Sequence, residues 1–171
     1  MRKDLSIKIK RFLANDKVGA ILIVAIMCIF LIIATDSFAS GRNIITLVKQ
    51  SSFYLIVVMG CLCVFMGGGM DLSTGATMCL SAILCAKCAQ VSVDAPVIVI
   101  WLVAIAVGVI VGGANGFLIG YMKLPPFIET LGMSILLAGV TLLITQGYSV
   151  NNLSDRFNAM GIGKLGPIPI P

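Results

Sequence analysis

Histidine is absent from this chain of 171 residues, and charged residues make up only 11% of it. The missing histidine removes a common ligand from any zinc site, although six cysteines are present. The scarcity of charge, together with 59% hydrophobic residues and a mean hydropathy of +1.10, excludes an ordinary soluble domain, which needs a polar shell. A membrane protein is expected, and the lipid bilayer is therefore one of its expected partners.

The cysteines all lie within apolar runs, which favours small buried hydrophobic side chains over chemistry. Their spacings, C-x-C and C-x-x-C, could also bind a soft metal or cycle between thiol and disulfide, but the thiolates that this requires are costly in lipid. We expect no metal site and no cofactor. An intramembrane thiol enzyme stays as an alternative. The cysteines are Cys28, Cys61, Cys63, Cys79, Cys85 and Cys88.

The N-terminal segment, residues 1–17, carries six basic residues and precedes the first apolar run. By the positive-inside rule it is cytoplasmic. It lacks the interleaved aromatic residues of a nucleic-acid-binding segment, so nucleic acid is not an expected partner. No small-residue cleavage site follows, and the run Val18–Thr35 is too long for the core of a signal peptide. An uncleaved, multi-pass protein of the bacterial inner membrane is expected.

The apolar runs predict an all-α, polytopic membrane helix bundle of about five spans over residues 18–146. The segment 36–50 is polar and is expected to lie outside, with the stretch 44–48 at the membrane interface. Residues 147–171 have no helical or strand period and are expected to form an extracytoplasmic loop, truncated before another helix. The predicted spans are 18–35, 51–66, 72–86, 96–121 and 125–145.

The stretch Met66–Ala76 sets three glycines and Asp71 between two apolar runs, each shorter than the roughly 20 residues of a full crossing. One interpretation is a tight cytoplasmic turn. The other, which we favour because the stretch has no Lys or Arg, is a possible broken helix near Gly67–Ser73, where irregular backbone lines a substrate site. Asp71 or Ser73 can also cap the helix that follows.

Gly108, Gly112, Gly116 and Gly120 recur at every fourth position of the fourth run and share one helix face. Such a stripe of small residues is expected to be a helix-packing surface. Asn115 lies beside it and is expected to make an interhelical hydrogen bond or a substrate contact.

The prolines at 125 and 126 end one helix and suit the start of the next, so Glu129 and Thr130 fall in its first turn. Glu129 is expected to be solvated or paired.

Three ordered motifs carry a family resemblance: Gly-Gly-Met-Asp-Leu-Ser-Thr-Gly at 68–75, Gly-Gly-Ala-Asn-Gly-Phe-Leu-Ile at 112–119, and Leu-Pro-Pro-Phe-Ile-Glu-Thr-Leu-Gly at 124–132. With them the chain resembles the permease subunits of bacterial ABC importers for ribose, galactose and related sugars, a branch that also includes the autoinducer-2 permeases. Met70 and Thr74 stand where the family usually has Ile and Val. The family's members are about twice as long, and the loop that docks on the ATP-binding subunit lies in their second half.

The resemblance implies a permease subunit that forms part of the pathway for a monosaccharide and performs no chemistry itself. The partners it implies are a cytoplasmic ATP-binding subunit, an extracytoplasmic sugar-binding protein and a second permease subunit. A non-transporting membrane scaffold is the main alternative. The motif positions that could bind sugar hydroxyls or a sugar ring are Asp71, Ser73, Thr74, Asn115, Phe127 and Thr130.

Overall fold

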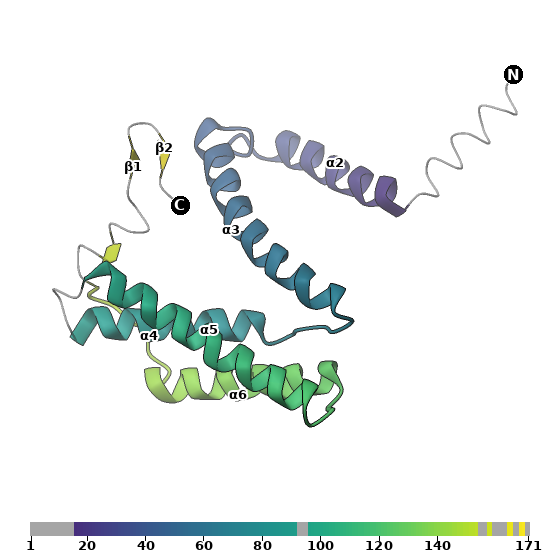
Figure 1. The fold of residues 1–171 in the computed structure, drawn as a ribbon. Coiled ribbons are helices and arrows are strands. Elements are labelled where there is room, and N and C mark those ends of the chain that lie inside the picture. The colour runs from purple at the N-terminus through teal and green to yellow at the C-terminus, as the bar shows by residue number, and fades with distance from the viewer. Residues whose placement is uncertain (1–15, 92–95, 154–156, 159–163, 166–167, 170–171) are drawn as a thin grey trace, which may run out of the picture. The chain divides into compact units, whose positions relative to one another are not determined.

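The computed structural model describes residues 16–91, 96–153, 157–158, 164–165 and 168–169. Most of the basic N-terminal segment, residues 1–15, lies outside this range. The helices in chain order are α2 (Asp16–Ala34), α3 (Gly41–Met66), α4 (Thr74–Val91), α5 (Val97–Gly120) and α6 (Pro126–Thr145) (Figure 1). The expected helical architecture is therefore confirmed.

Four of these helices, α3 to α6, are long and apolar enough to cross a membrane. The shortest of them, α4, has 18 residues, which span about 27 Å at 1.5 Å per residue, close to the roughly 30 Å hydrocarbon layer. The apolar part of α2, Val18–Ala34, is shorter. The chain is thus a multi-pass membrane protein.

Helix α3 is longer than the sequence pattern predicts. The segment 36–50 was expected to lie outside as a polar piece, followed by a short apolar run. Instead the helix begins at Gly41 and has 26 residues. Polar residues continue the helix because the end of a span can pass through the membrane interface, where their side chains remain hydrated. The apolar run is therefore the second part of a full-length helix.

The segment Gly67–Ser73 lies between two helices that are each long enough to cross the membrane. The interpretation of a break inside one helix depended on short flanking runs, so the observed lengths favour a connection between two spans. The chain turns at Gly68, whose φ of +80° is accessible to glycine without strain. Next to it, the backbone N–H of Gly69 donates to the carbonyl of Val64 at 3.2 Å.

Helix α4 packs against both α5 and α6, and the three lie alongside one another (Figure 1). Each helix contributes to one apolar cluster, made of Leu80, Val107, Val111 and Leu137. A second cluster lies further along α4 and at the start of α5, and consists of Cys85, Ala89 and Ile100. Because later residues of α4 meet earlier residues of α5, the two helices are antiparallel.

Prolines and left-handed residues mark the ends of these helices. Pro96 directly precedes α5, and Pro126 is the first residue of α6, where its missing N–H costs nothing. The prediction that the prolines start α6 is thus confirmed, whereas α5 already ends at Gly120, before they are reached. Between α5 and α6 the backbone reverses at Lys123, with φ of 60°, and α6 ends at Gln146, with φ of 52°. The turn at Lys123 brings the first residues of α6 back beside the end of α5.

The chain after α6 returns to α4. The side-chain amide of Gln90 donates to the carbonyl of Asn151, and Phe157 packs against the Cys85 cluster. Two antiparallel strands of two residues each, β1 (Lys164–Leu165) and β2 (Ile168–Pro169), follow. The sequence predicts an irregular loop over this range, and a strand pair this short adds little stability of its own.

Candidate functional site

Asp71 organises the turn that leads into α4. Its Oδ1 accepts hydrogen bonds from the backbone N–H of Ser73 at 2.7 Å and from the Ser73 hydroxyl at 2.6 Å. Its Oδ2 accepts from the hydroxyl of Thr74 at 3.1 Å. A carboxylate at the start of a helix satisfies free donors and interacts favourably with the positive end of the helix dipole. Asp71 and Ser73 were the two candidates for capping α4, and it is the Asp71 carboxylate that accepts the hydrogen bonds of the turn.

A buried row of polar side chains connects this turn to α5 and α6. Ser73 is 1% exposed, and Asn115 and Glu129 are each 7% exposed. The amide of Asn115 lies 2.8 Å from the Ser73 hydroxyl and 3.2 Å from Oε1 of Glu129. Three separate segments therefore meet through hydrogen-bonding groups in the interior of the bundle.

Thr130 ties the first turn of α6 to the backbone next to Asp71. The side chain is 1% exposed. Its hydroxyl is 3.1 Å from the carbonyl oxygen of Met70 and 2.8 Å from that of Pro126. The threonine of the third motif is thus held against the loop of the first motif, 60 residues earlier in the chain.

A cavity of about 360 Å³, here called cavity A, opens beside these polar groups. Its size lies at the lower end of the range of about 300 to 1,000 Å³ that is usual for small-molecule sites. The wall combines a carboxylate, an amide and a hydroxyl with apolar and glycine surface. Its lining residues are Val64, Gly67, Gly69, Met70, Asp71, Gly112, Asn115, Gly116, Ile119, Gly120, Pro126 and Thr130.

Two further cavities continue cavity A along α5. Cavity B, about 160 Å³, shares Asp71, Gly112 and Asn115 with cavity A. Cavity C, about 660 Å³, shares Thr77, Met78 and Gly108 with cavity B and extends to Ala104. From Ala104 to Gly120 the helix rises about 24 Å, which is most of the hydrocarbon thickness. The Asp71 and Asn115 side chains stand where cavities A and B adjoin.

The four glycines of the α5 stripe all border these cavities. Apart from its own residue, the two adjacent residues and the nearby backbone of α5, a Cβ atom added at any of them would meet no atom of the described chain within 4 Å. The row of α5 that does pack against neighbours lies one position earlier and includes Val107, Val111 and Asn115. Within the described residues no helix approaches the glycine stripe closely, so a packing role would need a surface outside them and stays a prediction.

The structure brings together five of the six predicted pathway residues. Asp71, Asn115 and Thr130 line cavity A, and Ser73 and Thr74 line cavity B. Phe127 is 54% exposed and is not among the residues that line these cavities. The remaining polar side chain of the buried row, that of Glu129, was not predicted to belong to the site.

Of the two expectations for Glu129, solvated or paired, the first is wrong, because the folded chain leaves Glu129 only 7% exposed, and one of its oxygens, Oε1, lies 3.2 Å from the Asn115 amide. Its Oε2 has no hydrogen-bond partner within the part of the chain that the structure describes. An acidic residue within an apolar run was the available sequence signal. Its position one turn inside α6 concealed its burial, because an acid in a first helical turn is ordinarily explained by the helix dipole.

The cysteines are unpaired thiols, and the described residues contain no group of three or more side chains placed to hold a metal ion. Cys85 is buried, and its thiol is 3.4 Å from the carbonyl oxygen of Ile100. Cys61 lies 3.8 Å from the Thr74 hydroxyl, sulfur to oxygen.

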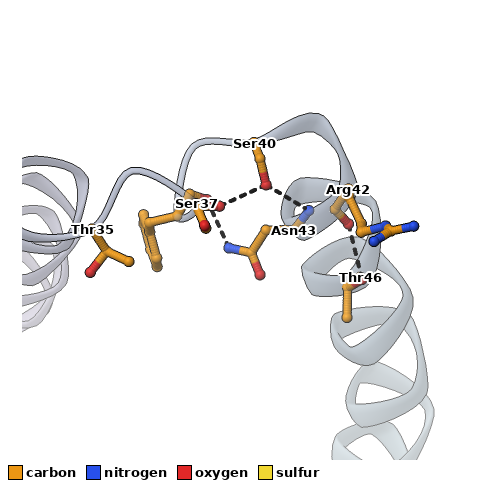
Figure 2. A pocket seen from close by; sticks show the side chains of 7 residues that line it. Thr35, Ser37, Ser40, Arg42, Asn43 and Thr46 are labelled. Atoms are coloured by element: carbon orange, nitrogen blue, oxygen red, sulfur yellow. Dashed lines mark hydrogen bonds between the residues drawn. The ribbon is translucent and has the colours of Figure 1, made fainter.

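A separate pocket of about 410 Å³ lies at the turn between α2 and α3. Figure 2 shows how the turn is held: the Ser40 hydroxyl donates to the Ser37 carbonyl at 2.6 Å, and the backbone N–H of Asn43 donates to Ser40 Oγ at 3.4 Å. The Asn43 side chain donates to the carbonyl of Phe38 at 2.7 Å. These bonds cap the start of α3 and account for the polar residues of the turn.

The bundle of apolar helices around a partly polar cavity defines a multi-pass membrane protein with room for a small ligand. The chain belongs to the family described as branched-chain amino acid transport system permease components, whose model matches residues 43–163. No solved structure matches the chain.

Three relatives are named as sugar permeases. The ribose import permease of Haemophilus influenzae is 31% identical over 96% of this chain and 51% of its own length. The D-allose transport system permease of Escherichia coli is 36% identical over 91% of this chain and 48% of its own. The galactose/methyl galactoside import permease of Escherichia coli is 32% identical over 78% of this chain and 43% of its own length. The chain spans about half the length of these relatives, and the family resemblance of its motifs is confirmed.

Proposed function

We propose that this chain is a permease subunit of an ABC importer and forms part of the pathway for a monosaccharide. The observation that carries the proposal is cavity A, which places Asp71, Asn115 and Thr130 around one space in a chain of the permease family. A sugar offers hydroxyl groups in several directions. Carboxylate, amide and hydroxyl side chains can all bind them, and each bond is weak enough for the sugar to leave.

The succession of cavities along α5 supports a role in passage as well as in binding. Cavities A, B and C share lining residues in pairs, and their combined floor includes the glycine stripe. Glycine leaves room above the helix and presents backbone in place of a side chain. Asp71 and Asn115 are then placed to contact a sugar that moves from cavity A to cavity B.

The partners follow from the class of transporter. A permease of this kind needs a cytoplasmic ATP-binding subunit to drive transport, an extracytoplasmic binding protein to deliver the sugar and a second permease subunit to complete the pore. ATP hydrolysis belongs to the ATP-binding subunit, and the permease itself is not an enzyme. We place the chain in the bacterial inner membrane with its basic N-terminus in the cytoplasm, following the charge distribution.

The test is a labelled-substrate uptake panel. The gene for this chain and the genes that flank it are expressed in cells that lack their own ribose, allose and galactose importers. Uptake of these three sugars and of leucine, isoleucine and valine is then measured. We expect uptake of at least one sugar and none of the amino acids.

Uptake of a branched-chain amino acid alone would replace the sugar with the substrate that the family's description names. No uptake of any compound, at normal membrane abundance of the chain, would favour the non-transporting scaffold. The matched control is the same gene set without this chain.

A further inference from the structure

The two ends of the Asn115 amide have opposite hydrogen-bonding character, and the neighbouring groups decide which end faces Ser73 and which faces Glu129. The oxygen accepts, whereas the nitrogen donates. With Nδ2 toward Ser73, Oδ1 faces the Val111 carbonyl and Oε1 of Glu129. With the amide reversed, Nδ2 donates to Val111 at 3.3 Å and to Glu129 at 3.2 Å, and Oδ1 accepts from Ser73 at 2.8 Å.

Two neighbours distinguish the arrangements. The Val111 carbonyl and an ionised Glu129 can only accept, so both favour Nδ2 on their side, whereas the Ser73 hydroxyl can donate or accept. A carboxylate can only accept and holds Nδ2, whereas a protonated carboxyl group can donate to Oδ1. Glu129 is not among the lining residues of cavities A, B or C. Its hydrogen-bond contact with a residue that lines these cavities is the one to the Asn115 amide.

The effect continues beyond Asn115 to the carboxylate of the first motif. The Ser73 hydroxyl has one proton and two acceptors in reach, Oδ1 of Asp71 at 2.6 Å and the amide of Asn115 at 2.8 Å. If Asn115 presents its oxygen, it competes with Asp71 for this proton. If it presents its nitrogen, the proton is left to Asp71. The direction of the Asn115 amide thus decides how strongly the Ser73 hydroxyl is hydrogen-bonded to Oδ1 of Asp71.

We propose that Glu129 is a positioning residue that, together with the Val111 carbonyl, fixes the direction of the Asn115 amide and so sets which polar groups face the transported sugar. The burial of Glu129, with one carboxyl oxygen lacking any partner among the described residues, supports this role. A buried polar group left unsatisfied is costly, so retaining it calls for a compensating function. The consequence for sugar uptake rests on the proposed function, whereas the contact with the amide does not.

The contact is tested without transport. The protein is labelled with ¹⁵N-asparagine and placed in lipid nanodiscs, and the side-chain amide of Asn115 is assigned by its loss in Asn115→Asp. We expect Glu129→Leu to shift this resonance and to speed its exchange with solvent. Glu129→Gln is expected to preserve slow exchange, because the Gln side-chain oxygen can still accept from Nδ2 of Asn115. An unchanged resonance and exchange rate in Glu129→Leu would overturn the proposal.

The consequence for transport is tested in the same variants. Glu129→Leu is expected to raise the KM of uptake about tenfold, the effect of roughly one lost hydrogen bond, with a similar maximal rate per molecule. Glu129→Gln and the exposed neighbour control Ile128→Leu should stay within about twofold. A normal KM in Glu129→Leu, while Asn115→Ala impairs uptake, would refute positioning. Unimpaired uptake in Asn115→Ala would count against the proposed pathway instead.

If Glu129→Leu does not accumulate in the membrane, the double variant still tests the proposal. Replacing both partners by apolar residues removes the unsatisfied group that one replacement leaves behind. We therefore expect Asn115→Leu/Glu129→Leu to accumulate better than Glu129→Leu alone. Equal or additive losses in the double variant would mean that the two side chains do not act together.

Discussion

The two ends of the α4–α5 contact are formed by different kinds of side chain. At the start of α4, the contact passes through Asp71, Ser73 and Asn115 and is flanked by cavities A and B. At the far end, it passes through the cluster of Cys85, Ala89 and Ile100. Ala89 is 1% exposed. The same pair of helices is therefore joined by polar side chains at one end and mainly by apolar side chains, including the buried Ala89, at the other.

The difference separates positions that hold the bundle together from positions that are available to a ligand. A small apolar residue in a filled contact tolerates little added volume. A polar group beside an open cavity contributes less to packing, and its loss should reduce recognition more than abundance. The following predictions test this division, with uptake measured for the sugar found in the panel.

The largest expected effect is at Asp71. Asp71→Asn or Asp71→Ala should lower uptake per molecule by at least about tenfold, because hydrogen bonds to a charged group contribute roughly 1.5 to 3 kcal/mol each. Membrane abundance should fall much less. The measurement is initial uptake divided by the amount of protein in the membrane, with the exposed Asp36→Asn as control. If abundance falls in parallel with uptake, Asp71 is only a helix cap.

Ala89→Leu should produce the opposite pattern. Extra atoms in this filled contact are expected to cost about 1 to 3 kcal/mol, which lowers the melting temperature and the membrane abundance. Uptake by the molecules that remain should be unchanged. Val91→Leu on the same helix is the control, since Val91 is 89% exposed. A stable Ala89→Leu protein with impaired uptake would break the division between the two ends.

Gly116→Leu is expected to have an intermediate effect because it fills part of cavity A. Uptake per molecule should fall about fivefold, which corresponds to roughly 1 kcal/mol, while abundance is retained. The control is Gly113→Leu, at a position outside the lining of cavities A and B. Loss of abundance or of subunit assembly, with normal uptake by the remainder, would support the helix-packing role that the glycine stripe predicts.

The smallest effect is expected when all six cysteines are replaced by alanine. Uptake per molecule should stay within about twofold, since only Cys85 is fully buried and each replacement removes a single sulfur atom. Radiolabelled uptake and melting temperature of the cysteine-free protein provide the measurement. Complete loss of uptake in a well-folded variant would instead favour a function for the thiols.

The position of the connection between α3 and α4 shows what the apolar pattern does not determine. The run from Ser51 to Met66 looks too short to cross a membrane, yet α3 includes ten further residues because Gly41–Gln50 continues the helix. Hydropathy detects where side chains prefer lipid, whereas a helix ends where its backbone hydrogen bonds end. Pro96 and Pro126 were reliable boundaries because their effect on the backbone is local.

By itself, the sequence determined the class of protein, the family motifs and the polar candidates Asp71, Ser73, Asn115 and Thr130. These features are local or compositional, so a single chain suffices to recognise them. Only the tertiary structure decided that α5 turns Val107, Val111 and Asn115 toward its neighbours and its glycines toward open space. It alone placed Glu129 against Asn115. The reason is physical: which face of an apolar helix is covered depends on residues far away in the chain.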